Sequence, residues 1–304
     1  MAHSFCIRAG TRAAAVLLLA LALLGPPGVA AAPAAITAET LGVLVNTADE
    51  HSVTAGEYYL RARGIPPENL VRVSLPVDEA VLSVAAFAEL RARIDARAPP
   101  GIRAWAVMWR LPYRVACMSI TSALALGFDR AWCARGCEPT RRSPWFNSRE
   151  RDPLTRHGLT PAMMVQGRDL LATLALIDRG VRADGTRPRG TAYLVQTDDR
   201  ARSVRSRWYP ALVRRFRGRL AVRHVKQNTL RHRRDVLFWF TGARRVAHIA
   251  DNEFLPGAIA DHLTSFGGRL DGEKQMSVMD WIEAGATGSY GTVVEPCNFP
   301  QKFP

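Results

Sequence analysis

The feature that most constrains the fold is a repeated alternation of short apolar strands with helices. Residues 41–46 (LGVLVN), 69–75 (NLVRVSL) and 102–109 (IRAWAVMW) have the composition of buried strands. Residues 52–63 and 78–98, which lie between them, have a helical pattern and end at Gly- or Pro-containing stops. A strand, helix, strand unit returns the chain in the same direction. The pattern therefore predicts an α/β fold with a mostly parallel sheet flanked by helices.

The second half of the chain repeats this pattern less regularly. We expect a helix over 169–179 and strands at residues 191–196, 220–225, 236–241 and 245–250. In the last fifty residues we expect helices and then a buried strand, at residues 256–266, 276–283 and 287–294. With 304 residues, of which 48% are hydrophobic, the chain is long and apolar enough for a substantial core. We therefore expect two similar α/β halves, residues 38–132 and 162–304, joined by an irregular Cys-containing loop at 133–161.

The N-terminus has the pattern of a secretory signal peptide. Arg8 and Arg12 precede an apolar run at residues 13–24, and small residues follow up to Ala31. We predict cleavage near Ala31, which makes residues 1–31 the signal peptide, with an uncleaved anchor as the alternative. No later stretch is long and apolar enough for a stable membrane span. The expected protein is exported, either periplasmic or secreted.

Four cysteines remain after cleavage, and in an oxidising compartment they can pair in three ways. Cys133 and Cys137 flank a short segment containing Gly136, so we predict a disulfide between them. Cys117 and Cys297 are then either paired with each other or free. Zinc is disfavoured because the C-x3-C motif has no second ligand pair at a suitable spacing. No metal and no other cofactor is expected.

The formal net charge of +14 does not by itself indicate a nucleic-acid partner. Only three of the 41 basic residues are lysines, which indicates the arginine bias of a GC-rich gene, and no specific nucleic-acid partner is expected. The densest cluster lies between Arg200 and Arg245, with Trp208 and Phe216 interleaved. It is either a solvated helix face or a surface for polyanions such as acidic polysaccharide or lipid headgroups.

Polar residues follow several of the expected strands. In a doubly wound parallel sheet the carboxyl ends of the strands share one edge, and ligands bind outside that edge. We therefore expect one rim that carries Asn46, Asp198, Asp251, Asn252, Glu295 and Cys297. Helix capping is the alternative role for Asp198 or its neighbour Asp199. We expect Glu295 to pair with Arg63 or Arg110 and Asp251 to line an open groove.

Four segments resemble an uncharacterised family of exported bacterial proteins: VLVNTADEHSVTAGEYYLRARGIPPENLVRVSLP, CMSITSALALGFD, PGAIADHLTSFGG and EAGATGSYGTVVEPCNFPQKFP. This resemblance covers nearly all of the mature chain and implies a further helix and strand beyond Pro304. More remotely, GEYYLRARGIPPENLVRV is similar to legumain-like and gingipain-like peptidases, and WIEAGATGSYGTVVEP to the late helix and strand of the caspase-like fold. The remoter resemblance implies a caspase/gingipain-like scaffold and a cysteine peptidase with a His-Cys dyad.

The sequence departs from that dyad. The resemblance implies a His-Gly after one strand and a Cys after the next. The expected strands instead end in Thr241-Gly242 and in Asp251-Asn252. An alternative dyad is His262 with Cys297, provided that a helix carrying His262 packs on the following strand. The competing interpretation is that His262 belongs to the helix surface and that Cys297 is oxidised to Cys117.

Two functions of different classes remain open. The first is a peptidase-like hydrolase with a nonstandard site around Asp251, His262, Glu295 and Cys297. The second is a catalytically silent envelope protein that binds a peptide, a glycan or another envelope component. In that case the strand-end groove and the 133–161 loop form the binding site.

Overall fold

The computed structural model describes residues 36–133, 136–146, 148–150, 156–270 and 274–297. By their contacts these residues fall in a single unit. The expected signal peptide and its cleavage site lie outside the described residues.

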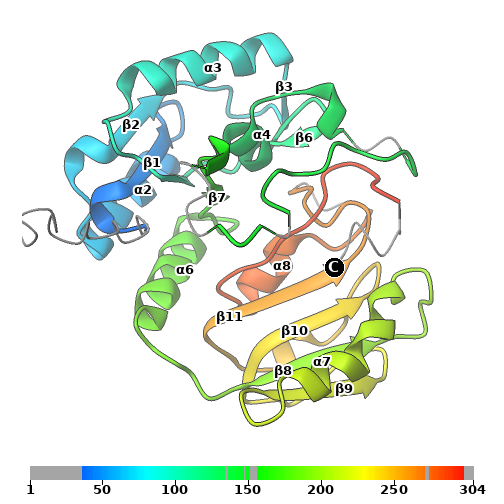
Figure 1. Ribbon diagram of the computed structural model, residues 1–304. Helices are drawn as coiled ribbons and strands as arrows, with labels where there is room; N and C mark the ends of the chain where they lie inside the picture. Colours follow the sequence, from blue (N-terminus) through cyan, green and yellow to red (C-terminus); the bar gives the residue numbers. More distant parts are fainter. Residues whose placement is uncertain (1–35, 134–135, 147, 151–155, 271–273, 298–304) are drawn as a thin grey trace, which may run out of the picture. The chain divides into compact units, whose positions relative to one another are not determined.

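The first sheet is built by the first half of the chain. Its strands are β1 (Leu41–Asn46), β2 (Leu70–Val73), β4 (Ala104–Val107) and β7 (Ala162–Met164), in the order β2-β1-β4-β7 and all parallel. Helices α2 (Glu50–Arg63), α3 (Val84–Arg97) and α4 (Ile120–Leu126) accompany this sheet (Figure 1). Because β7 pairs with β4, the first sheet takes its fourth strand from beyond the expected boundary at residue 161.

Local signals explain where these elements begin and end. The Asp49 carboxylate accepts from the backbone N–H of His51 at the start of α2, and Gly64 ends the helix in the left-handed region at φ 61°. The expected helix over 78–98 starts later, at Val84, and Ser83 caps it. The reason is a small three-stranded sheet: β3 (Val81–Leu82) pairs with β5 (Arg114–Val115), which pairs with β6 (Met118–Ser119).

The second sheet has the same plan. Its strands are β8 (Thr191–Gln196), β9 (Ala221–Lys226), β10 (Val236–Gly242) and β11 (Phe254–Leu263), in the order β11-β10-β8-β9 and all parallel. Both sheets have the same strand order in space. The second strand along the chain lies at one edge, and next to it across the sheet come the first, the third and the fourth. The helices of this half are α6 (Leu170–Ala183), α7 (Tyr209–Arg215) and α8 (Val278–Glu283). The prediction of an α/β fold with mostly parallel strands flanked by helices is confirmed, although the strands form two separate parallel sheets.

Three expected elements of the second half were wrong. The expected helix over 256–266 is strand β11, and no strand forms at 245–250, where a turn leads into a 3-10 helix at Ile249–Asp251. Residues 287–294 form only an isolated bridge between Gly288 and Ile259. The side chains of β11 explain the first error, because Ala258 and Ala260 are small enough to be completely buried against the neighbouring elements.

Further 3-10 helices lie at Ala38–Thr40, Pro67–Asn69, Arg130–Trp132 and Val204–Trp208. Within the described ranges, no helix combines the length and apolarity that a membrane crossing requires.

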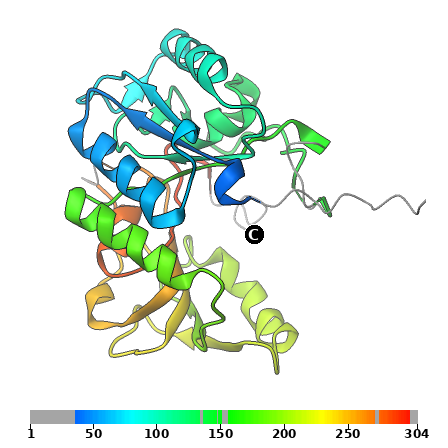
Figure 2. The same ribbon diagram turned by 90° about the vertical axis from the view of Figure 1, so that its left-hand side faces the viewer.

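Helix α6 links the two halves. The Tyr58 hydroxyl of α2 donates to Asp178 of α6 at 2.6 Å, and the Arg179 guanidinium donates to the carbonyl of Ile282 in α8 at 2.9 Å. Both ribbon views show α6 beside α2 (Figures 1 and 2). A shared apolar cluster adds to this link, since Tyr113 of the first half packs with residues of the second half: Leu270, Met279 and Val293.

Candidate functional site

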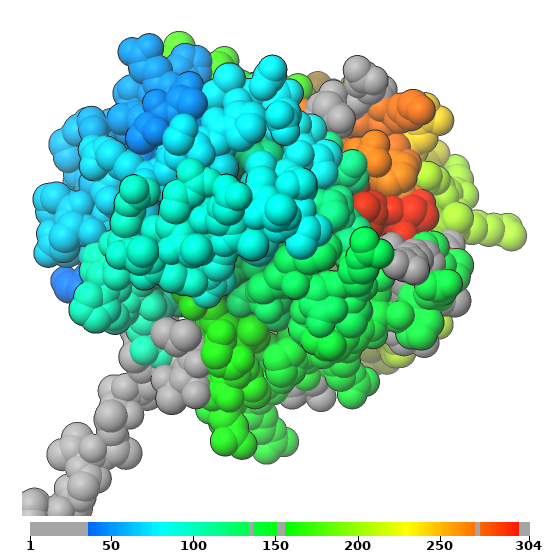
Figure 3. Space-filling model, turned by 90° about the horizontal axis from the view of Figure 1, so that it is seen from above, coloured from blue at the N-terminus to red at the C-terminus, as the bar shows by residue number. Residues whose placement is uncertain are grey.

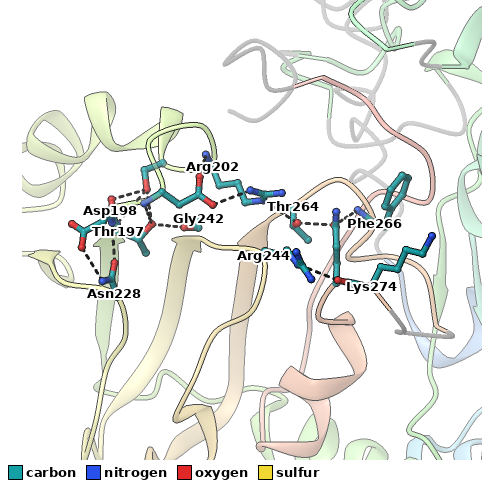
Figure 4. A network of polar contacts seen from close by, with 12 residues as sticks. Thr197, Asp198, Arg202, Asn228, Gly242, Arg244, Thr264, Phe266 and Lys274 are labelled. Atoms are coloured by element: carbon teal, nitrogen blue, oxygen red, sulfur yellow. Dashed lines mark hydrogen bonds and ion pairs between the residues drawn. The ribbon is translucent and has the colours of Figure 1, made fainter.

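The carboxyl ends of β8, β10 and β11 are tied together by side chains that follow the strands (Figure 4). The Thr197 hydroxyl, just beyond β8, donates to the carbonyl of Gly242 at the end of β10. Arg202 donates from Nε to the Thr264 hydroxyl, just beyond β11, at 3.2 Å, and that hydroxyl donates to Gln275 at 2.7 Å. Polar groups therefore do converge at this edge, as parallel topology requires.

Gly242 allows the loop after β8 to fold over the end of β10. A Cβ atom at this position would collide with the backbone carbonyl of Arg202. The loop is held there by Asp199, which accepts from the Arg202 backbone N–H at 3.1 Å and pairs with its guanidinium at 2.9 Å. Asp199 therefore holds the turn before the 3-10 helix Val204–Trp208, whose N-cap residue is Ser203, so neither member of this acidic pair caps that helix.

A buried ion pair lies behind this edge. Arg205 Nη1 is 2.5 Å from Asp261 Oδ2, and both side chains are almost fully buried. Arg205 also donates to the carbonyl of Thr241 at 2.7 Å and to the Tyr290 hydroxyl at 3.1 Å. Burial and then the Asp261 carboxylate raise the pKa of Tyr290 to about 12, so its phenol stays protonated at neutral pH. The cluster is internally neutralised and joins β10, β11 and the C-terminal segment.

His262 lies on β11, where it is buried and bonded at both ring nitrogens. Nε2 lies 2.9 Å from the carbonyl of Met276, and Nδ1 accepts from the indole N–H of Trp281 at 2.9 Å. These partners require the neutral tautomer with the proton on Nε2. Burial lowers the pKa of the imidazole, which favours the same neutral form. The ring is a part of the core and has no free nitrogen for proton transfer.

The predicted Cys133–Cys137 disulfide is wrong. The structure pairs Cys117 with Cys133, with Cα atoms 5.5 Å apart, and Cys137 with Cys297, with Cα atoms 4.9 Å apart. Cys133 follows the 3-10 helix at Arg130–Trp132 and packs into the first core beside Cys117. Cys137, four residues on, meets the C-terminal segment instead. Cys297 is therefore oxidised, though to a different partner from the one considered.

The expected common rim does not form. Asp251 and Asn252 precede β11 and so lie at the amino end of the second sheet, whereas Glu295 lines a pocket with Leu263 and Thr264 at the carboxyl end. Asp251 is 3.1 Å from the His248 ring, and Asn252 is buried with its amide donating to the carbonyl of Leu230 at 3.1 Å. Both residues shape the turn that leads into β11.

The remaining predicted ligand-binding residues also have structural partners. Asn46 is buried at the end of β1 and bonds both backbone groups of Leu75, at 2.9 and 3.1 Å. Asp198 and Asn228 exchange two hydrogen bonds of 2.9 Å. These contacts hold the chain that follows β1 and β8.

The expected partners of Glu295 are also different. The Glu295 carboxylate accepts from the Cys297 backbone N–H at 2.9 Å, and Arg63 pairs with Asp184. Neither Arg63 nor Arg110 forms an ion pair with Glu295 within the described ranges. The adjoining pocket, of about 290 Å³, is lined by Arg202, Thr264 and the Cys137–Cys297 disulfide.

A larger groove lies beside this pocket. It has a volume of about 1340 Å³ and is lined by residues within the ranges 117–126 and 137–146, by Trp132, by Arg207 with Trp208, and by residues within 291–296. We call it the Arg–aromatic groove. In the space-filling view the red C-terminal segment borders the green first half (Figure 3).

Three arginines of this groove stack on three aromatic rings. The guanidinium of Arg141 lies 5.1 Å from the ring centre of Trp132, and that of Arg142 lies 5.2 Å from Phe146. Arg207 lies 4.7 Å from the ring centre of Trp208. Sequence reasoning noted the loop and the basic cluster separately. The available signal was the proximity of arginines to aromatic residues within each, but nothing local showed that the two segments meet.

The strands of the second half end in other residues than a His-Cys dyad requires. The two neighbouring strands β10 and β11 end in Thr241-Gly242 and Leu263-Thr264, so neither end carries the implied His or Cys. No family model, curated protein or solved structure matches the chain. The fold and site together define an α/β protein with two parallel sheets and two disulfides. The Arg–aromatic groove is larger than the neighbouring pocket at the carboxyl edge of the second sheet.

Proposed function

We propose that this chain is an exported binding protein that holds an acidic glycan in the Arg–aromatic groove. The observation that carries the proposal is the stacking of three arginines on three aromatic rings along one groove. Its two disulfides support export, because such bonds persist in oxidising compartments. The caspase/gingipain-like relation is part of the proposal only as a relation of scaffold.

An acidic sugar matches both components of the groove. The C–H faces of a pyranose ring pack on aromatic faces, and Trp208 leaves 50% of its surface exposed for such a contact. A carboxylate on the same sugar can take two N–H donors of one guanidinium, the planar geometry that arginine provides and lysine does not. Stacking on the ring below pre-orients each guanidinium, which reduces the entropy lost on binding.

Binding is favoured over hydrolysis because the expected catalytic residues do not assemble. Cys297 is in a disulfide, the buried His262 has both nitrogens bonded, and Asp251 lies at the other end of the second sheet. A thiolate nucleophile needs a free sulfur and a nearby base. The described arrangement offers neither.

Calorimetric titration with two oligosaccharides of equal length tests this proposal. A uronic-acid hexasaccharide should bind, with affinity that falls as salt rises, and a neutral hexasaccharide should bind at least about tenfold more weakly because it lacks carboxylates. Arg142→Gln should weaken binding of the acidic ligand about tenfold or more; Arg142 is chosen because Arg141 also pairs with Asp129. Arg93→Gln is the matched control, because Arg93 is a half-buried arginine on α3 that pairs with Glu89 and does not line the groove.

Equal binding of the neutral and acidic sugars would contradict the proposal, as would no measurable binding of either. An acidic hexapeptide that bound in place of the sugar would assign the groove to peptides instead.

A further inference from the structure

The stretch from Arg200 to Arg234 contains neither aspartate nor glutamate, although the chain has 27 acidic residues. An arginine-rich gene composition explains many arginines but does not explain the absence of acids from one segment. Cations that lack neighbouring acids keep their full field toward solvent. Arg202, Arg205 and Arg234 pair with acids from outside the stretch, so the positive potential concentrates where its other cations are exposed.

It folds into α7 and β9 on one side of the second sheet. β9 is the edge strand, paired with β8 alone, and α7 packs beside it (Figure 1). Four arginines at the end of α7 and in the turn to β9 are exposed, as is the last residue of β9: Arg214, Arg215, Arg217, Arg219 and Lys226. None of these five forms an ion pair with any residue that the structure describes.

An exposed aromatic residue lies among these cations. Phe216, between Arg215 and Arg217, exposes 39% of its surface. The arginines of the Arg–aromatic groove stack on aromatic rings, whereas none of these four arginines stacks on a ring within the described part of the chain. Peripheral membrane-binding surfaces typically combine cations without acidic partners and an exposed apolar ring. The charges attract anionic headgroups, and the ring enters the membrane interface.

We propose that the α7–β9 face docks on a membrane surface rich in anionic phospholipid. Charge complementarity selects this occupant: a bilayer presents many phosphates side by side, which matches several separate cations better than one small ligand would. The exposed Phe216 ring adds an apolar contact that a soluble polyanion does not offer. None of the five cations lines the Arg–aromatic groove, and Phe216 does not either; Trp208, which does, lies at the opposite, N-terminal end of α7.

Vesicle sedimentation with the full chain tests this inference. The protein should sediment with vesicles of phosphatidylcholine containing about one third phosphatidylglycerol, and about 0.5 M salt should release it, since surface attraction is screened at that ionic strength. The variant with Arg214, Arg215, Arg217 and Arg219 all changed to Gln should lose about a hundredfold or more in partitioning, on the order of fivefold for each charge. Phe216→Ser should reduce partitioning as well.

The control is the variant with Arg91 and Arg93 changed to Gln, because these are arginines of α3, away from the α7–β9 face, that pair with Asp95 and Glu89. Equal binding to pure phosphatidylcholine, or wild-type partitioning of the fourfold variant, would overturn the inference. So would wild-type partitioning of Phe216→Ser together with release by a soluble polyuronate, which would assign the face to polysaccharide. The fourfold variant should still bind the uronic-acid hexasaccharide, so that failure here is distinguishable from failure of the proposed function.

Discussion

At the residue scale, His262 and the Arg205–Asp261 pair are polar groups with structural roles: they are buried and bonded to partners within the core. A protonated His262 would place two N–H donors, its own and that of Trp281, against each other. The folded protein therefore resists protonation of this ring, in agreement with the lowered pKa that burial causes. The polar side chains of these residues suggest a catalytic or binding site in the sequence, but their burial in the folded protein gives them a structural role.

The lowered pKa of His262 makes the stability of the folded protein depend on pH. Because the folded-state pKa of His262 is below its ordinary value of 6.5, the unfolded chain binds the proton first as the pH falls. Stability is therefore fully present above about pH 6.5 and is lost progressively below it. We expect His262→Gln to be less stable than wild type by about 1–3 kcal/mol at pH 7.5 and to have a shallower acid dependence. Urea denaturation between pH 5 and 7.5 measures both, and an unchanged acid slope in the variant would contradict the assignment.

The buried ion pair gives a second prediction. Asp261→Asn should lower the free energy of unfolding by about 3–5 kcal/mol, because it leaves the Arg205 charge buried without its partner. The double variant Arg205→Met, Asp261→Leu should recover much of that loss, since two apolar side chains need no partners. Chemical denaturation of the single and double variants decides this. A double variant no more stable than Asp261→Asn would contradict the coupling of the two charges.

At the element scale, whether a strand could be predicted from the sequence depended on its side-chain composition. β1 and β4 were predicted because branched and aromatic residues identify strands buried on both faces. β11 was not, because GAIADHL is composed of small and helix-favouring residues. Its strand conformation comes from pairing with β10 and from the Ala260 N–H, which donates to the carbonyl of Gly288 at 3.0 Å. Asp261 and Leu263 are buried as well as Ala260 and His262, so the segment lacks the alternation of apolar and polar residues that marks a half-buried strand.

Two glycine substitutions test whether the loop after β8 folds over the end of β10. Gly242→Ala should destabilise the protein by about 1–3 kcal/mol, because the new methyl group would meet the Arg202 carbonyl. Gly288→Ala is the control, since its methyl group would make only an ordinary contact of 3.7 Å with Ile259. Its effect should stay within about 0.5 kcal/mol. Thermal or chemical unfolding of both compares them, and equal effects would contradict this arrangement of the loop.

At the scale of the whole molecule, the two halves were predictable and the contacts between them were not. Repetition of a strand and helix pattern can be recognised within each half, but it contains no information about which loops meet. The predicted common rim failed for this reason, because Asn46 and Thr197 end strands of separate sheets and Asp251 precedes a strand that was not foreseen. The groove was missed because its arginine and aromatic pairs come from both halves.

The cysteine pairing tests the placement of the loop. Cys133 and Cys137 are close in sequence but lie against different halves, so proximity along the chain predicted the wrong bond. Proteolysis without reduction, followed by mass spectrometry, should yield peptides that link Cys117 to Cys133 and Cys137 to Cys297. A peptide in which Cys133 is joined to Cys137 would contradict the structure of the loop and of the groove beside it.

If the Arg–aromatic groove binds the glycan, removing a ring that lines it must weaken binding, and removing a nearby ring outside it must not. Calorimetric titration of the uronic-acid hexasaccharide should give an affinity for Trp208→Ala at least about tenfold below that of wild type. Removing the indole ring should cost on the order of 1–2 kcal/mol of binding free energy. Trp145→Ala is the matched change, since Trp145 lies in the 137–146 segment with 40% of its surface exposed but does not line the groove. Trp145→Ala should bind the hexasaccharide as tightly as wild type. Equal affinity of Trp208→Ala and wild type would contradict it.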